Sequence, residues 1–247
     1  MVLRKLLLSF LVVISFLAQN LGAKDIKVGL EPFPPLINED GTGYSINFLR
    51  ALEKVSDLKF NITIVPYSRA KFGLEKGDFD IIGHTPYQNE TKEFYVFAQD
   101  LPWSLGAVVD IYGTSPDTIS AEKFKTLKMI GVPLGNKEFF AEILGIPQAS
   151  FYEGTLETLA KMLPLGRIDA LIFSRAATMA TFKKLQIKGI NYRLLDDSVQ
   201  AGFALRKDKD GTDLLEQLKI IMTKVDQKSI FKDYSNFLTM AKSGVLN

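Results

Sequence analysis

Short apolar runs alternate with segments of helical periodicity in the first third of the chain. Residues 26–30 form a compact apolar run with β-branched side chains, which predicts a strand. Apolar residues then recur at helical spacing from Tyr44 to Val55, which predicts a helix. Two further strands are expected at 60–65 and 79–83, with a helix at 70–76 that ends at Gly77. This βαβαβ order predicts a parallel sheet with right-handed crossovers.

The second half of the chain repeats this pattern. Strands are expected at 128–132, 149–152, 168–173, 192–195 and 202–205, and helices at 137–144, 156–163, up to 185, 214–225 and 230–240. Two such units predict two α/β lobes that face each other across a cleft. Ligands of α/β sheets bind at the carboxyl ends of the strands, and a hinge between the lobes can close the cleft around them.

The first 23 residues have the layout of a secretory signal peptide. Arg4 and Lys5 precede a continuous apolar run at 6–18, and a short polar-to-small stretch ends at Ala23. An uncleaved anchor is the alternative, but the run is shorter than the roughly 20 residues that span a bilayer. No cysteine follows to carry a lipid. We therefore predict a protein exported to the periplasm.

Composition removes several function classes. The chain is 47% hydrophobic and 23% charged, as ordinary globular proteins are, and it has no cysteine and one histidine. We expect no disulfide, metal site or other cofactor. Without Arg4 and Lys5, Lys plus Arg falls from 30 to 28 and equals Asp plus Glu, so we expect no nucleic-acid partner.

Several runs resemble the amino-acid-type periplasmic solute-binding proteins of ABC transporters, known as family 3. These runs are "IKVGLEPFPPLINEDGTGYSIN", "GLEKGDFDII", "LKMIGVP", "GRIDALIF" and "AGFALRKD", in that order. The resemblance implies the two-lobed α/β fold of type II periplasmic binding proteins, with mostly parallel sheets. One lobe would hold 24–108 plus 204–247 and the other 109–203, with hinge crossings near 108–111 and 200–203. It also implies a monomer that is not an enzyme, and that delivers a small molecule to an ABC permease in the inner membrane.

The resemblance breaks down where family members hold a free α-amino acid. Thr91 stands six residues before Phe97, where the family has the arginine that binds the α-carboxylate. Ser174 stands where an acid binds the α-ammonium. A buried zwitterion needs a partner for each charge. We therefore expect a ligand that is not held by the usual clamp, unless the loop register slips and the adjacent Lys92 and Arg175 substitute.

Ten residues are candidates for contact with the ligand. They are Glu31, Phe33, Arg69, His84, Tyr87, Trp103, Asn136, Lys137, Ser174 and Arg175. Phe33 falls where the family stacks an aromatic ring on the ligand, and His84 where it lines the cleft. The structural alternatives are core packing for the aromatic residues and surface positions for Arg69 and His84. Together, Arg69, Lys92, Lys137 and Arg175 predict a basic cleft and thus an acidic ligand.

Two other functions are compatible with the same scaffold. One is an enzyme similar to cyclohexadienyl dehydratases, for which Glu31 and His84 are the acid-base pair that can be nominated. The other is a sensor, or a binding protein that has lost transport. The leading hypothesis remains a binding protein that feeds a transporter.

Overall fold

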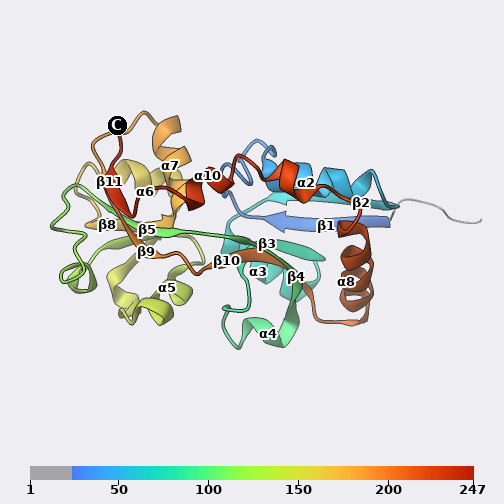
Figure 1. Cartoon of the computed structure of the whole chain (residues 1–247). Helices are drawn as coiled ribbons and strands as arrows, with labels where there is room; N and C mark the ends of the chain where they lie inside the picture. Colours follow the sequence, from blue (N-terminus) through green and yellow to red (C-terminus); the bar gives the residue numbers. More distant parts are fainter. Residues whose placement is uncertain (1–23) are drawn as a thin grey trace, which may run out of the picture.

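A computed structural model describes residues 24–247, so the predicted signal peptide at 1–23 lies outside the described residues. Figure 1 shows two lobes side by side, each built on a sheet flanked by helices. The predicted two-lobed α/β fold is confirmed. Among the described helices, none combines the length and apolar character needed to cross a bilayer.

The first lobe is built on a five-stranded sheet of order β2-β1-β3-β10-β4. Its strands are β1 (Lys24–Leu30), β2 (Leu58–Ile64), β3 (Ile81–Pro86), β4 (Ala98–Gly106) and β10 (Gln200–Arg206). The predicted parallel pairing holds for β1 with β2 and β3, whereas β10 runs antiparallel between β3 and β4. Strand β4 was not predicted, because Pro102 and polar residues interrupt its apolar pattern.

Helices cover this sheet and extend to the hinge. They are α2 (Tyr44–Glu53), α3 (Tyr67–Lys76), α4 (Phe94–Phe97), α8 (Lys209–Met222), α9 (Gln227–Ile230) and α10 (Ser235–Leu238). Gly77 ends α3 in the left-handed conformation, as its sequence position predicts. The single helix expected at 230–240 is wrong, since α9 and α10 are separate turns. Between them, Phe231 packs on Trp103 and Tyr234 donates a hydrogen bond to Gly106 O at 2.9 Å.

The second lobe has a six-stranded sheet of order β11-β9-β5-β8-β6-β7. Its strands are β5 (Val109–Gly113), β6 (Ile130–Pro133), β7 (Phe151–Gly154), β8 (Ala170–Ser174), β9 (Asn191–Asp196) and β11 (Ser243–Val245). Its α-helices are α5 (Lys137–Leu144), α6 (Leu156–Met162) and α7 (Arg175–Lys184), with 3₁₀ turns at Phe124–Thr126 and Gln148–Ser150. Strand β6 is parallel to both β7 and β8, whereas β5 runs antiparallel to β8 and β9. Both sheets are therefore mixed, and the expectation of mostly parallel sheets is corrected, because the strands next to the hinge run antiparallel to their neighbours.

Three chain segments connect the lobes. Residues 107–108 join β4 to β5, and residues 197–199 join β9 to β10. After α10 the chain crosses again, and β11 pairs with β9. The whole tail, residues 204–247, was expected to lie in the first lobe. Its last strand, β11, instead belongs to the second-lobe sheet. Strand β11 covers the edge of β9, whose backbone groups would otherwise lack partners, and a three-residue strand leaves little pattern to detect.

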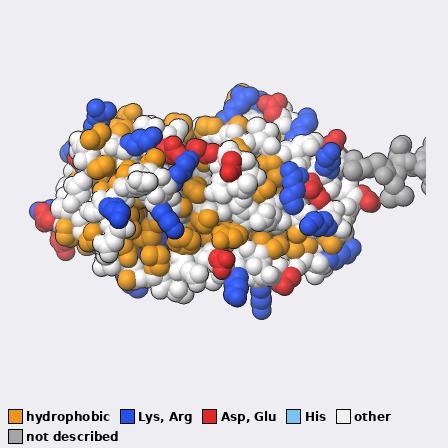
Figure 2. Space-filling model, turned by 90° about the horizontal axis from the view of Figure 1, so that it is seen from above, with side chains coloured by type: hydrophobic (Ala, Val, Ile, Leu, Met, Phe, Trp, Pro, Cys, Tyr) orange, Lys and Arg blue, Asp and Glu red, His pale blue; other side chains and the backbone are white. Residues whose placement is uncertain are grey.

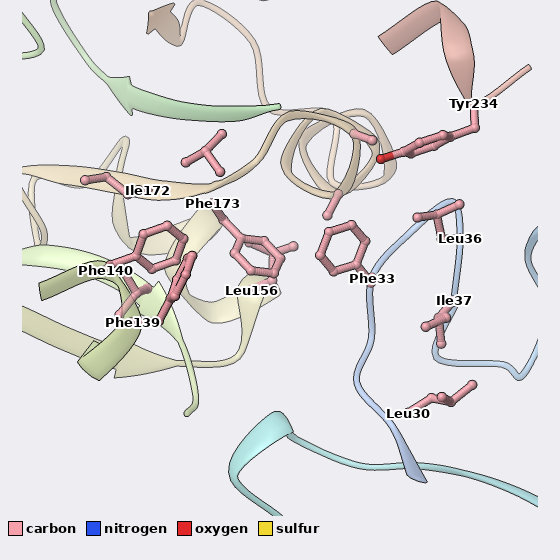
Figure 3. Packing of buried hydrophobic residues seen from close by; sticks show 14 of the residues in the cluster. Leu30, Phe33, Leu36, Ile37, Phe139, Phe140, Leu156, Ile172, Phe173 and Tyr234 are labelled. Atoms are coloured by element: carbon pink, nitrogen blue, oxygen red, sulfur yellow. The ribbon is translucent and has the colours of Figure 1, made fainter. Parts of the chain in front are cut away.

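A chain of aromatic contacts runs from the first-lobe core to the second lobe. Trp103 stacks on Phe48 and Phe203, and Phe203 meets the edge of the His84 ring. His84 stacks on Phe33, whose ring lies 5.2 Å from that of Phe173 in the other lobe. Figure 3 shows Phe33 projecting toward Phe173 at this junction. The two cores therefore meet as one hydrophobic cluster.

Candidate functional site

A cavity of about 830 Å³ lies between the two lobes. This volume is in the range of roughly 300–1,000 Å³ that is common for small-molecule sites. Residues of both lobes line it: Glu31, Pro32, Pro34, Pro35, Asn38, Glu39, Asp40, Ile64, Val65, Pro66, Tyr67, Pro133, Leu134, Gly154, Thr155, Leu156, Glu157, Ala180, Thr181 and Lys184.

The topology explains why these residues meet. In each sheet one strand lies between the next two strands of the chain: β1 lies between β2 and β3, and β6 between β7 and β8. Loops therefore diverge at the carboxyl end of this strand and leave a crevice, as at switch points of α/β sheets. The carboxyl ends of β1 and β2 face those of β6 and β7 across the cavity. The predicted position of the cleft thus matches the position of the cavity.

Glu31 follows β1 directly and is 4% exposed. Its Oε2 accepts a long hydrogen bond of 3.4 Å from Asn136 Nδ2, which comes from the second lobe. Burial raises the pKa of the Glu31 carboxyl to about 8, although Asn136 and the charge of Lys71 oppose the rise. Glu31 is therefore largely protonated near pH 7, since no residue within 24–247 forms an ion pair with it.

His84 lies within β3, rather than after it as predicted, and is also 4% exposed. Its Nε2 is 2.8 Å from Ser45 Oγ, and its Nδ1 has no hydrogen-bond partner within residues 24–247. Burial lowers the pKa of the imidazole to about 3, so the ring is neutral. His84 and Phe33 stack together in the seam between the lobes and are absent from the cavity lining.

The lobes touch on one side of the cavity. Lys71 Nζ donates to Gly135 O at 3.2 Å across the lobes and lies 3.5 Å from Glu90 Oε1. Gly135 has a φ of +89°, and a Cβ built on it would lie 2.5 Å from the backbone nitrogen of Ser68. A side chain at position 135 would therefore push the lobes apart.

All three guanidinium nitrogens of Arg175 donate hydrogen bonds within the protein. Its Nε donates to Asp110 Oδ2 at 2.7 Å and its Nη2 to Asp110 Oδ1 at 2.8 Å. Its Nη1 donates to Met240 O at 3.2 Å, which fixes the chain just before β11. Arg175 is 2% exposed and outside the cavity lining, so the structure places this predicted ligand contact in the core of the second lobe.

The other predicted residues also lie away from the cavity surface. Arg69 is exposed beside Phe72, and Trp103 Nε1 donates to Gln227 Oε1 at 2.6 Å. Tyr87 is half-buried, Lys137 pairs with Glu153 at 3.8 Å, and Ser174 is buried with no partner for Oγ among the described residues. Of the ten candidates, Glu31 alone appears in the described lining, and Asn136 acts through it. Lys92 is also outside the lining, so none of the four residues expected to make the cleft basic borders the described cavity.

Sequence reasoning missed most of the charged lining. Glu39 and Asp40 belong to the "NEDGTG" loop, which was interpreted as a turn. It is one, because Asp40 accepts hydrogen bonds from Thr42, but it also borders the cavity. Glu157 and Lys184 sit on α6 and α7, where no local pattern distinguishes them from solvated helix residues. Their proximity to the first lobe depends on lobe packing alone.

The described residues contain no group of three or more His, Asp or Glu side chains placed to hold a metal ion. On the face shown in Figure 2, charged side chains of both signs are scattered, and hydrophobic ones extend across the middle.

This architecture is that of the two-lobed periplasmic binding proteins. No family model matches the chain. It is 26% identical over 190 residues, 72% of this chain and 69% of the relative, to the probable amino-acid-binding protein YxeM of Bacillus subtilis (strain 168). The resemblance to amino-acid-type solute-binding proteins is thereby confirmed.

Solved structures support the same fold. The arginine-, lysine-, histidine-binding protein ArtJ of Geobacillus stearothermophilus is 20% identical with a TM-score of 0.69, covering 86% of this chain and 96% of its own. An ancestral amino-acid-binding protein described as a precursor of cyclohexadienyl dehydratase is 20% identical with a TM-score of 0.66, covering 87% and 96%.

Proposed function

We propose that this protein is an exported binding protein that captures a small polar solute between its lobes. The observation that carries the proposal is the cavity of about 830 Å³ between the strand ends of both sheets. A ligand there contacts both lobes at once, and so it stabilises the closed arrangement over the open one.

The protein would act in the periplasm as a monomer that delivers its solute to an ABC-type permease. The support is the likeness to YxeM, named as a probable amino-acid-binding protein, and the export signal expected from the sequence. The usual amino-acid clamp is not part of the proposal. Thr91 and Ser174 stand at the two positions where the clamp has charged residues. Arg175, next to Ser174, donates its hydrogen bonds to Asp110 instead.

Binding is favoured over catalysis by the state of the nominated acid-base pair. A general base works best when its pKa is near the operating pH. Burial lowers the pKa of His84 to about 3, and its ring lies outside the cavity lining. Acid-base catalysis needs a second group that returns the proton, and Glu31 is the member of the nominated pair that borders the cavity. We therefore expect no turnover of prephenate or arogenate.

Ligand-dependent thermal unfolding tests this function. The protein, purified after export, is heated with amino acids, dicarboxylates, amines, small phosphates and aromatic acids. A bound solute at 100 times its Kd adds about 2.7 kcal/mol to the free energy of unfolding. If no compound raises the melting temperature, the proposed function is wrong.

Two glycine variants separate closure from folding. Gly135→Ala places a Cβ against Ser68, whereas Gly145→Ala strains a similar positive-φ position with nothing within 4 Å. We expect Gly135→Ala to abolish the ligand-induced shift and Gly145→Ala to retain it. Equal shifts in both variants would show that binding does not require the lobes to meet.

A further inference from the structure

We infer that the solute is a cation without a carboxylate, an amine or guanidinium compound, and that Glu31 is its counter-ion. This inference rests on the proposed binding function and names the ligand class for the same cavity.

The lining is predominantly acidic. The first lobe contributes Glu31, Glu39 and Asp40, and the second contributes Glu157, against the single lining cation Lys184. Lys184 Nζ contacts Glu157 Oε1 and lies 3.5 Å from Glu39 Oε2. Within residues 24–247, Glu31 and Asp40 form no ion pair. An arriving solute therefore meets more negative than positive charge.

The cations near the cleft are already paired. Lys71 lies beside Glu90, Lys137 beside Glu153, and Arg175 is held by Asp110. A solute carboxylate entering the cavity would lose its hydration without gaining a free cationic partner among the described residues. Desolvation of an unpaired charge is unfavourable by several kcal/mol, so the lining selects against anions.

Glu31 has fewer hydrogen bonds than a buried carboxylate needs. The residue is 4% exposed, yet the part of the chain that the structure describes provides its carboxyl with one side-chain donor, Asn136 at 3.4 Å. Strong donors to carboxylates lie at about 2.7–2.9 Å. Its Oε1 accepts no hydrogen bond from residues 24–247, although the carboxyl borders the cavity. An ammonium or guanidinium group would supply both the missing donors and the missing charge.

The walls fit the rest of such a molecule. Pro34, Pro35 and Pro66 of the first lobe face Leu134 and Leu156 of the second across the cavity. Methylene groups gain free energy on leaving water for such walls, about 0.8 kcal/mol each. An aliphatic chain between Glu31 and the acidic loop at Glu39 and Asp40 would suit both the walls and the charges.

Calorimetric titration of the protein purified after export tests the inference. The probes are agmatine and putrescine, which are cations without a carboxylate, arginine, which adds an α-carboxylate, and succinate, a dianion. We expect agmatine or putrescine to bind at least tenfold more tightly than arginine, and succinate not to bind. Glu31→Gln should weaken amine binding at least tenfold, about 1.4 kcal/mol. Glu142→Gln, at an exposed position on α5, is the matched control and should bind like the wild type.

The outcomes separate this inference from the proposed function. Binding of arginine or succinate with no binding of the two amines overturns the inference and leaves solute capture standing. Equal amine affinity in Glu31→Gln and the wild type overturns the role of Glu31. If none of the four probes binds and the thermal panel also fails, both conclusions fall.

Discussion

Two buried carboxyl groups, one in each lobe, have opposite relations to the rest of the chain. Asp110, on hinge strand β5, receives two short bonds from Arg175. Glu31, at the end of β1, receives one long bond from the neutral amide of Asn136. Burial raises the pKa of both groups, and at Asp110 the bonds from Arg175 oppose the rise. Among residues 24–247, Arg175 is the counter-ion of Asp110, and none forms an ion pair with Glu31.

This difference distinguishes a structural ion pair from a binding site. The Arg175–Asp110 pair is closed, and through Met240 O it also fixes the segment that leads to β11. Nothing further can bind there without breaking charge-assisted bonds. Glu31 borders a cavity and has donor positions to fill. Because burial of an unpaired carboxylate is unfavourable, we infer that a ligand completes Glu31.

The largest effect is expected from removing the counter-ion of Asp110. Arg175→Met leaves a buried carboxyl without its partner, which costs about 3–5 kcal/mol of folding free energy. Urea unfolding at neutral pH measures the loss. Adding Asp110→Asn to the same chain should recover much of it, because the unpaired charge is then gone. A loss below about 1 kcal/mol in the single variant would mean that the pair adds little to stability.

The second effect is a pH dependence that Glu31 imposes on stability. Its pKa rises from an ordinary 4.5 to about 8 on folding, so between these values the folded chain holds a proton that the unfolded chain has lost. The free energy of unfolding therefore falls as pH rises through this window, by up to about 1.4 kcal/mol per unit.

Comparison with Glu31→Gln isolates this contribution, because the amide cannot titrate and His84 is common to both proteins. We expect the variant to gain roughly 2 kcal/mol on the wild type between pH 5 and pH 7. The measurement is urea unfolding of both proteins across this range. Parallel pH profiles would show that Glu31 is ionised in the folded protein and that its counter-ion lies within the chain.

A smaller effect is expected from shortening the tail beside the closed pair. A chain that ends at Lys242 keeps the bond from Arg175 to Met240 O but loses β11, including the bonds that link Leu246 to Ile190 and Gly189. At about 1 kcal/mol per hydrogen bond, unfolding should require about 1–2 kcal/mol less. Differential scanning calorimetry checks this value. A loss of unfolding free energy as large as that of Arg175→Met would show that β11 is an integral part of the second-lobe core.

The smallest effect on stability, and the most selective on binding, is expected at the mouth of the cavity. Lys184 is exposed and bridges Glu39 and Glu157. Lys184→Gln should leave unfolding unchanged, because exposed ion pairs add little. It should strengthen amine binding a few-fold at low salt by removing a competing cation. Lys183→Gln, at the exposed neighbouring position, is the control. Equal amine affinities in the two variants would show that Lys184 does not act at the binding site.

Local sequence patterns specified most of the elements around the cleft. The apolar run before Glu31, the helix that ends at Gly77 and the strand-helix alternation of the second lobe each follow from side-chain periodicity. Together with short connections, they predict parallel strands whose carboxyl ends carry the loops, as observed for β1 to β3 and β6 to β8. The position of a cleft could therefore be predicted, because strand order and handedness constrain where a crevice opens.

The chemistry of the cleft was decided by contacts between residues distant in sequence. Arg175 was expected to reach a ligand, but its Nε and Nη2 donate to Asp110, 65 residues earlier in the sequence. Glu157 and Lys184 become cavity residues only when the lobes meet. Charge in a buried site depends on which groups are left unpaired after packing, and no local pattern records that pairing. The sequence by itself thus determined two α/β lobes and a cleft, and the tertiary structure decided that its lining is acidic, with Glu31 left unpaired.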